Sequence, residues 1–294
     1  MLHRIETGDS PPIRTRGYRH TPADNEEINS QAREMLAAGV IEESDTAWGS
    51  PVILVSKKEF AGVSSKRFVV DFHKLNAVTK LTSFPLPTIE TVLDTVAEQK
   101  PLLWTSLDLR SGYWQTCLNP ETADRTGFST QEGRFRFKRV PFGLCGAFQF
   151  FQQVMHKVLR GLTPSSVLVY LDDILVWGKT PDDMIQKLDL VFQRFRAANL
   201  RLHPAKCHWS ADRVRFLGHV FDRNGISLDE SKLSIVRDFP RPRTPKHIKR
   251  FLGLCNYYRR FEKSFSQISA PMRALLKGTC DLNGRTNVRR LSRS

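Results

Sequence analysis

Apolar residues at helical spacing mark the first element of this chain. They follow a Thr-Pro pair, which favours a helix that begins at Pro22 with Thr21 as its N-cap. Gly39 is a suitable residue to end this helix. The apolar face of the predicted helix consists of Ile28, Ala32 and Leu36. Residues 1–20 are polar and contain Arg and Pro, so we expect them to form an extended arm.

Short apolar runs then predict strands, because they are rich in β-branched or aromatic residues and lie between polar turns. They occupy 51–55, 66–71, 102–109, 125–140 and 214–226. The last two runs contain Asn, Gln and Gly at turn positions, which predicts that each of them is a hairpin.

Longer segments return to helical spacing. In 147–162 the expected apolar face comprises Phe148, Phe151, Met155 and Val158. Further helices are predicted over 87–99, 182–199, 232–239, 246–261 and 268–277. Because strands and helices are interleaved and hairpins recur, we expect an α+β fold with an antiparallel sheet packed on helices.

One predicted hairpin carries two charges at its turn. Residues 167–177 form two apolar runs, and Asp172 and Asp173 lie between them. Two carboxylates beside a buried sheet are costly without a partner, and a divalent cation is the simplest one. A rigid hairpin that offers two acids to a metal suits phosphoryl-transfer chemistry.

Two-metal chemistry needs a further carboxylate from another strand. Asp108 lies at the end of the run 102–109. If that strand neighbours the hairpin, we expect Asp108 and Asp172 to face each other and to hold ions about 3.5–4 Å apart. The alternative interpretation is that Asp108 only caps the turn before Arg110.

Charge indicates the class of partner. The 294 residues include 45 Lys and Arg against 30 Asp and Glu, a net charge of +15, which favours a nucleic acid over a generally basic surface. Residues 241–294 hold 14 Lys and Arg and 2 acids, as in an element that grips a phosphate backbone. The five cysteines lack the spacing of a zinc site, and no apolar segment reaches the ~18–20 residues of a membrane span.

Several motifs occur together in one order. Tyr170-Leu171-Asp172-Asp173 matches a Y-x-D-D box, and it is accompanied by Arg67-Phe68-Val69-Val70-Asp71, Phe84-Pro85-Leu86-Pro87, Ser106-Leu107-Asp108-Leu109, Pro141-Phe142-Gly143-Leu144-Cys145, Phe216-Leu217-Gly218-His219 and Phe251-Leu252-Gly253-Leu254. Over about residues 1–278 the series resembles the reverse transcriptase domain of gypsy-type LTR retrotransposon Pol polyproteins.

This resemblance implies a right-hand polymerase fold and an RNA-directed DNA polymerase. The implied division is an arm at 1–20, fingers at 21–80 and 116–155, a palm at 81–115 and 156–222, a thumb at 223–278, and a disordered basic tail at 279–294. The implied cofactors are two Mg²⁺ or Mn²⁺ ions. The implied partners are dNTPs and a primed RNA or DNA template, in a cytoplasmic retroelement particle or the nucleus.

The resemblance also assigns roles to single residues. Asp108, Asp172 and Asp173 would hold the metals together with the Leu109 carbonyl, and Lys206 would protonate the leaving pyrophosphate. Arg67 and Lys58 would contact the triphosphate, because Arg can bind phosphate bidentately. The remaining contacts would be Tyr113 as the steric gate for the sugar, Phe142 and Gly143 near nucleotide and template, Phe216, Leu217, Gly218 and His219 as the primer grip, and Lys246, Lys249, Arg250, Arg259 and Arg260 on duplex phosphates.

Two departures from the family pattern leave an alternative open. Phe148 stands where the family usually has a proline, at the start of a helix that supports the template. No RNase H sequence follows residue 277, so we expect a truncated copy of Pol. The alternative function is a catalytically inactive relic that only binds nucleic acid. An RNA-directed RNA polymerase is disfavoured by the bulk of Tyr113.

Overall fold

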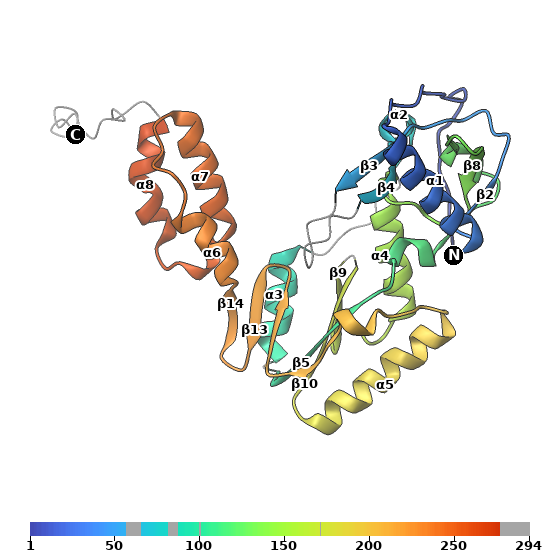
Figure 1. The fold of residues 1–294 in the computed structure, drawn as a ribbon. Coiled ribbons are helices and arrows are strands. Elements are labelled where there is room, and N and C mark those ends of the chain that lie inside the picture. The colour runs from blue at the N-terminus through green and yellow to red at the C-terminus, as the bar shows by residue number, and fades with distance from the viewer. Residues whose placement is uncertain (57–65, 82–87, 100, 171, 277–294) are drawn as a thin grey trace.

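The computed structural model describes residues 1–56, 66–81, 88–99, 101–170 and 172–276, and these form three regions (Figure 1). A lobe of small sheets and helices, the N-terminal lobe, lies above one end of a central sheet. Three C-terminal helices lie on the side of the central sheet that faces away from the N-terminal lobe. They are joined to the central sheet through a small antiparallel sheet. Lys58 and the tail 279–294 lie outside the described residues.

The N-terminal lobe contains three small sheets with the strand orders β2-β8-β7, β3-β4 and β1-β6. Its elements are β1 (Leu2–His3), α1 (Pro22–Ala37), β2 (Ile41–Glu43), β3 (Val52–Ser56), β4 (Lys66–Val70), α2 (His73–Val78), β6 (Cys117–Leu118), η2 (Ala123–Thr126), β7 (Phe128–Ser129) and β8 (Arg134–Phe137). The expected hairpin over 125–140 is confirmed as β7–β8.

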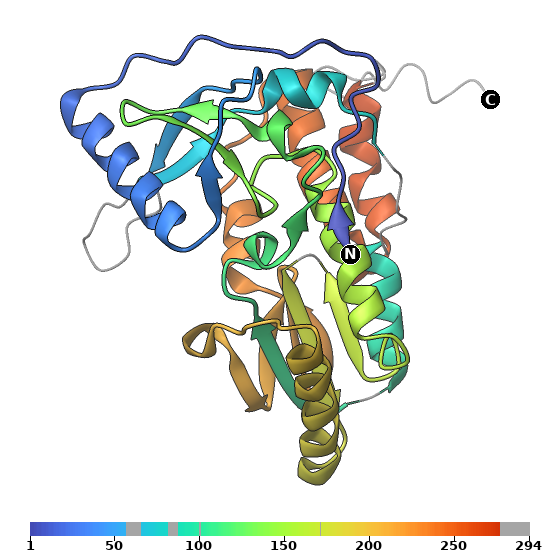
Figure 2. The same ribbon diagram turned by 90° about the vertical axis from the view of Figure 1, so that its right-hand side faces the viewer.

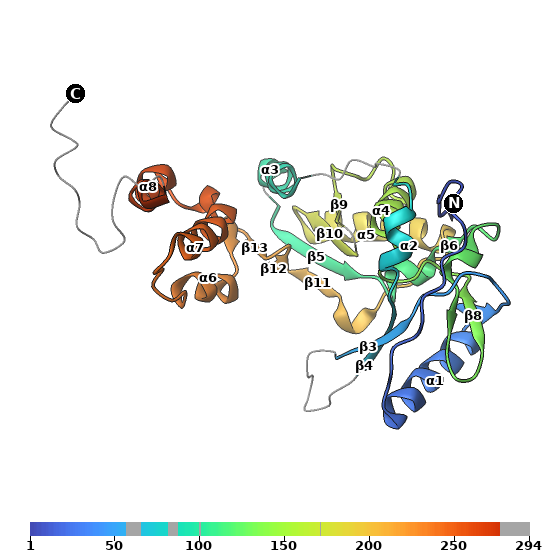
Figure 3. The same cartoon turned by 90° about the horizontal axis from the view of Figure 1, so that it is seen from above.

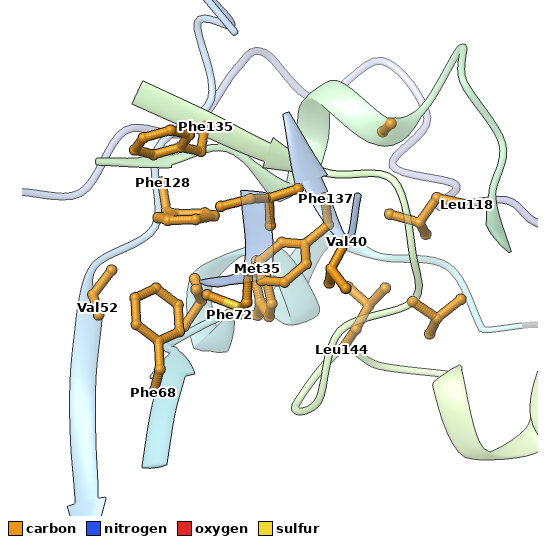
Figure 4. Close-up of a cluster of buried hydrophobic side chains, with 14 of the residues drawn as sticks. Met35, Val40, Val52, Phe68, Phe72, Leu118, Phe128, Phe135, Phe137 and Leu144 are labelled. Atoms are coloured by element: carbon orange, nitrogen blue, oxygen red, sulfur yellow. The ribbon is translucent and has the colours of Figure 1, made fainter. Parts of the chain in front are cut away.

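Aromatic side chains form the core of this lobe (Figure 4). The ring centroid of Phe128 lies 5.4 Å from that of Phe68, 5.6 Å from that of Phe135 and 5.3 Å from that of Phe137. Each fully buried Phe contributes on the order of 1.5–3 kcal/mol to folding. The core therefore ties β4, which carries Arg67, to β7 and β8.

Helix α1 begins and ends as predicted but presents a different apolar face. Thr21 caps it by accepting a hydrogen bond from the Asp24 amide. Ile28 and Ala32 are buried, whereas Leu36 is exposed and Met35 is buried in its place. The prediction for Leu36 was wrong because the helix repeats every 3.6 residues, and a spacing of four drifts off the buried face after two turns.

The expected arm is more closely integrated than its composition suggested. Most of residues 1–20 is extended, but β1 pairs in parallel with β6. The Ile5 side chain is completely buried, and its amide donates to Thr122 Oγ1. The first residues are thus part of the N-terminal lobe.

The central sheet has the order β11-β5-β10-β9 and is fully antiparallel. Its region comprises α3 (Ile89–Gln99), β5 (Leu103–Asp108), η1 (Gly112–Gln115), α4 (Ala147–Val158), β9 (Val167–Tyr170), β10 (Asp173–Gly178), α5 (Pro181–Ala197), η3 (Pro204–Lys206) and β11 (His208–Ala211). Figures 1 and 2 show α4 and α5 beside this sheet. The sheet is buried on both sides, since Leu107 and Ile174 pack with α4 and α5, whereas Trp104 and Leu175 pack with α3 and β12–β13.

Helix α4 connects the two cores. Ala147 at its start packs in the N-terminal lobe, while Phe151 and Met155 are completely buried against the central sheet. Phe148, predicted to lie on the apolar face, is instead exposed. Gln152 is buried and donates from Nε2 to the Val169 carbonyl on β9. A glutamine can occupy the buried face because its amide satisfies a backbone acceptor there.

The run 214–226, expected to be one hairpin, is a three-stranded meander followed by helices. The polypeptide turns twice, at Leu217-Gly218 and at Arg223-Asn224. Both Leu217 and Gly218 have positive φ, which a tight turn between antiparallel strands favours. The elements of this region are β12 (Arg213–Phe216), β13 (His219–Asp222), β14 (Gly225–Leu228), α6 (Glu230–Arg237), α7 (Pro245–Tyr257), η4 (Arg259–Phe261) and α8 (Phe265–Leu276).

In the described part of the chain, no helix has the length and apolar character needed to cross a bilayer.

Candidate active site

Three aspartates meet where strand β5 ends and the antiparallel strand β10 begins. The sheet register places Asp173 directly opposite Asp108, and Asp172 lies one residue earlier, in the turn between β9 and β10. Opposed residues of antiparallel strands point to the same side, with Cβ atoms about 4.5–5.5 Å apart. The sequence predicted that Asp108 would face Asp172. In the structure the residue directly opposite Asp108 on the neighbouring strand is Asp173. Asp108 and Asp172 nevertheless line the same cleft.

The surroundings of Asp172 disfavour its negative charge. Its Oδ1 atom is buried and has no hydrogen-bond partner among the described residues. Burial, and then the charges of Asp173 and Asp108, raise the pKa of Asp172. Desolvation, and then the charge of Asp108, raise the pKa of Asp173 as well. The three carboxylates therefore repel one another unless a cation is bound between them.

The cleft that holds Asp108 and Asp172 has a volume of about 600 Å³. One wall is the strand end and the turn that follows it, and the other is β4 with helix α1. The cleft is lined by Gln31, Glu34, Met35, Ala38, Arg67, Phe68, Asp108, Leu109, Arg110, Ser111, Gly112, Trp114, Phe142, Asp172 and Lys206. The cleft thus joins residues that are more than 170 positions apart in the sequence.

Lys206 lies close to the end of β5. It belongs to η3, and its Nζ lies 4.0 Å from Asp108 Oδ1. The Lys206 side chain is 62% exposed, so this long contact contributes little to stability. Its ammonium is nevertheless a proton donor beside the carboxylates.

Leu109, the residue after Asp108, lines the same cleft. Leu109 forms an antiparallel bridge with Leu202. The hydrogen bonds of this bridge join the Arg110 amide to the Arg201 carbonyl and the His203 amide to the Asp108 carbonyl. The bridge therefore fixes the backbone on both sides of Leu109 without using the Leu109 carbonyl.

Aromatic rings link the two walls of the cleft. The Arg67 guanidinium carbon lies 5.7 Å from the centroid of the Phe142 ring, within cation–π range. The Tyr113 ring stands edge-on to Phe142 and Phe151, with both centroids 5.3 Å away. Burial and the charge of Asp172 raise the pKa of Tyr113 to about 12, so Tyr113 stays neutral. Tyr113 is thereby held rigidly beside Asp172.

The turn at Gly143 is fixed by the side chain of Asn76, to which the sequence assigned no role. Gly143 has a φ of +84°, and its carbonyl accepts from Asn76 Nδ2. The Oδ1 atom of the same Asn76 accepts from the Cys145 amide. Asn76 on α2 thus holds the loop that carries Phe142.

The predicted primer-grip residues form the β12–β13 turn, but their side chains point inward. Phe216 and His219 are buried. His219 Nδ1 lies 2.9 Å from the Leu217 carbonyl, and its ring contacts Tyr257 and Phe261, with centroids at 6.2 and 5.4 Å. Any contact of this turn with a primer would therefore involve backbone atoms rather than the His219 ring.

The basic residues predicted on the C-terminal helices differ in their availability. Lys246, Lys249 and Arg250 are exposed on α7. Arg260 is engaged in an ion pair with Asp94 on α3, at 2.5 Å between Nη2 and Oδ1. Arg260 therefore attaches the C-terminal helices to the central region, which its place in the basic segment did not indicate.

The donor atoms at the strand end fit Mg²⁺ or Mn²⁺. They are carboxylate and carbonyl oxygens, the ligands that these ions prefer, and one of them is buried without a partner. Within the described ranges, no group of three His, Cys, Asp or Glu side chains is already arranged as a ligand set. Asp108, Asp172 and Asp173 would thus have to rotate about their side-chain bonds to converge on an ion.

The fold has the right-hand architecture of polymerases, and three carboxylates lie at one end of its central sheet. A model of the family "Reverse transcriptase (RNA-dependent DNA polymerase)" matches residues 55–221, so the chain belongs to this family. The chain is 36% identical over 276 residues to the "Retrovirus-related Pol polyprotein from transposon 412" of Drosophila melanogaster, covering 93% of the chain and 22% of that protein. It is 33% identical to the corresponding polyprotein from transposon gypsy, covering 93% of the chain and 26% of that protein.

Solved structures agree with this family. A foamy viral protease-reverse transcriptase in complex with dsDNA superposes with a TM-score of 0.80 at 23% identity, covering 95% of this chain and 57% of that one. Native prototype foamy virus protease-reverse transcriptase gives a TM-score of 0.67 at 26% identity, covering 94% and 36%. The predicted right-hand fold and gypsy-type family are confirmed. The chain spans about a quarter of the length of the curated relatives.

Gly112→Ala is expected to slow nucleotide incorporation about tenfold to a hundredfold, because small displacements of reacting groups are costly. A Cβ atom at Gly112 would lie 2.8 Å from Asp172 Oδ1 and would push the carboxylate aside. Steady-state incorporation assays would measure this. Gly253→Ala is the matched control, because the added methyl meets open space on α7; equal losses in both variants would contradict the prediction.

Asp172→Asn is expected to stabilise the metal-free chain at pH 7 by about 0.2–1 kcal/mol, the usual cost of opposed like charges. Because the pKa of Asp172 is higher in the folded chain than in the unfolded one, the folded state binds more protons, and stability falls as pH rises through that interval. The gain should disappear below about pH 4, where the carboxyl is protonated in both states. Melting temperatures in EDTA would show this, and a variant that melts lower at pH 7 would contradict it.

Proposed function

We propose that the chain is an RNA-directed DNA polymerase that adds dNTPs to the 3′-hydroxyl of a primer. The observation that carries the proposal is the meeting of Asp108, Asp172 and Asp173 at one end of the central sheet, with Arg67 and Lys206 on the walls of the same cleft. This arrangement offers carboxylates for divalent ions and cations for phosphates, which nucleotidyl transfer requires.

The proposed regions follow the three parts of the structure. The N-terminal lobe, with most of α4, corresponds to fingers at 21–80 and 116–155, and the central sheet with its other helices to a palm at 81–115 and 156–222. The C-terminal helices correspond to a thumb at 223–278. Figure 3 supports this division, since α6–α8 stand apart from the N-terminal lobe with the central sheet between them.

The proposed chemistry assigns each group one task. Asp108, Asp172, Asp173 and the Leu109 carbonyl would hold two Mg²⁺ or Mn²⁺ ions, which when bound supply Lewis acidity at the 3′-hydroxyl and at the phosphates. Arg67 would orient the triphosphate with its guanidinium. Lys206 would donate a proton to the pyrophosphate as it leaves. Lys58 is proposed to assist Arg67 from outside the described residues.

The proposed sugar selection rests on Tyr113. Its ring is held between Phe142 and Phe151 and cannot easily move away from an incoming nucleotide. A rigid ring next to Asp172 would leave no room for a 2′-hydroxyl, so deoxynucleotides would be favoured. Phe142 and Gly143 would contribute to the floor of the same site.

The proposed nucleic-acid partner is a primed RNA or DNA template. Structural neighbours were solved in complex with an RNA/DNA hybrid and with dsDNA, which supports this class of ligand. The exposed cations Lys246, Lys249 and Arg250, with Arg259, would hold duplex phosphates without reading bases. The backbone of the Phe216-Leu217-Gly218-His219 turn would support the primer.

Primer extension by the full chain tests the proposed function. An RNA template with a DNA primer, dNTPs and Mg²⁺ or Mn²⁺ should give extension that requires the template and the metal. The same preparation should bind duplex with an affinity that falls as salt increases. Salt-sensitive binding without any metal-dependent extension would instead indicate the catalytically inactive nucleic-acid binder.

A further inference from the structure

The side chain of Gln31 makes a backbone-like contact with the strand that carries Arg67. Its Nε2 donates to the Lys66 carbonyl at 3.0 Å, and its Oε1 accepts from the Phe68 amide at 3.0 Å. These two peptide groups stand immediately before and after Arg67. The carboxamide of a helix residue thus brackets Arg67 in the way that a neighbouring strand would.

Strand β4 has a free edge that needs such a partner. In the described part of the chain β4 pairs only with β3, and Arg67 is opposite Val55. The outward-facing carbonyl and amide beside Arg67 are met by Gln31, so the backbone there is held from both sides. An edge strand with unpaired peptide groups would be freer to shift and twist.

Helix α1 is a firm base for this contact. It is anchored by the buried residues Ile28 and Ala32, which flank Gln31 on the helix. Glu27, one turn earlier, accepts a hydrogen bond from Gln31 Nε2 and thereby orients the carboxamide. Figure 3 shows α1 lying beside β3 and β4.

The contact has a direct geometric link to the active-site cleft. Gln31 and Arg67 both line it, together with Asp108 and Asp172. Arg67 also lies over the ring of Phe142, which lines the same cleft. A shift of β4 would therefore move the Arg67 guanidinium relative to the carboxylates.

We propose that Gln31 is a positioning residue that sets Arg67 for the triphosphate of the incoming nucleotide. The proposal rests on the proposed function, in which Arg67 contacts that triphosphate. Gln31 itself would act through the β4 backbone. Its loss would weaken nucleotide binding while the carboxylates that perform the chemistry remain in place.

Gln31→Met is the informative variant, because it keeps the length of the side chain and its helix propensity but removes its two hydrogen bonds to β4, along with the one to Glu27. With the full chain on a dideoxy-terminated primer–template, the Kd for the next dNTP should rise about fivefold to twentyfold, as expected for two lost hydrogen bonds. With an extendable primer, KM should rise similarly while kcat changes less than about twofold. Asp24→Asn is the matched control, since it removes another contact between α1 and β4, the ion pair with the Lys66 ammonium. It leaves the hydrogen bonds of Gln31 to the Lys66 carbonyl and the Phe68 amide in place.

A double-mutant cycle separates positioning from general stability. If Gln31 acts through Arg67, Gln31→Met should add nothing to the dNTP Kd in an Arg67→Met background. An equal increase in both backgrounds, or an unchanged Kd in Gln31→Met alone, would overturn the proposal. If the wild type binds dNTP more tightly than Gln31→Met but does not extend the primer, only the proposed function is refuted. If the wild type extends the primer but Gln31→Met binds dNTP equally well, only the positioning role is refuted. If the wild type does not extend the primer and the two proteins bind dNTP equally well, both are refuted.

Discussion

Asp108→Asn is expected to lower the rate of nucleotide incorporation about a thousandfold, as expected when several kcal/mol of metal-mediated charge stabilisation are lost. Asp108 lies across from Asp173 and shares the cleft with Asp172, so a neutral amide there removes one of the charges that would hold the ions. Single-turnover incorporation on a primed RNA template would measure the rate. Duplex binding should persist, because the proposed duplex contacts are on the C-terminal helices.

The control for this variant is Asp189→Asn. Asp189 lies on α5, bonded to Gln193, and does not line the cleft. The Asp189→Asn substitution changes the net charge of the chain by the same amount as Asp108→Asn. Comparable incorporation rates for the two variants would exclude a catalytic role for Asp108.

Tyr113→Val should relax the preference for deoxynucleotides over ribonucleotides by about a hundredfold, the scale on which one pocket wall discriminates a hydroxyl. The ring is packed between Phe142 and Phe151 beside Asp172, so its removal opens space where the sugar of a nucleotide would lie. The ratio of kcat/KM for dNTP and rNTP measures this preference.

Trp114→Phe is the comparison variant for Tyr113→Val. Trp114 is the next residue and also contacts Phe142, at 6.0 Å between centroids. It should keep the dNTP preference, because the Tyr113 ring remains in place. A Tyr113→Val chain that still rejects rNTPs as the wild type does would show that another group selects the sugar.

Local sequence features predicted the elements well where a single physical rule decides the outcome. The Thr21–Pro22 start of α1 and the turn between β9 and β10 follow from capping and from short apolar runs. The apolar faces were less predictable, as Leu36 and Phe148 show. The Leu36 error came from a four-residue spacing that drifts off the buried face of a 3.6-residue helix. The Phe148 error arose because spacing gives a direction on the helix, whereas burial depends on which neighbours the tertiary structure supplies.

The active site was predictable only in its motif residues. Asp108, Asp172, Arg67 and Lys206 were expected there, and they do line one cleft. The pairing of Asp108 with Asp173 depends on strand register, which sequence spacing does not determine. The contribution of α1 was missed because Gln31 has no local signal: its partners are the backbone of β4, 35 and 37 residues later.

Contacts between the C-terminal helices and the central region could not be predicted from the sequence. The His219 side chain was expected at the primer, but its ring is enclosed by Tyr257 and Phe261 from the C-terminal helices. Arg260 was expected on a duplex, but it pairs with Asp94. Both residues lie at the junction between the C-terminal helices and the central region, and only the packing of that junction reveals their partners.

Asp108, Asp172 and Asp173 are expected to hold two divalent ions when a nucleotide is bound. Electron paramagnetic resonance titration of Mn²⁺, with the full chain on a dideoxy-terminated primer–template and saturating dNTP, tests it without any turnover. We predict about two bound ions per wild-type chain and a clear loss of bound Mn²⁺ in Asp172→Asn. The same number of ions with the same affinity in both proteins would show that Asp172 does not hold a metal ion.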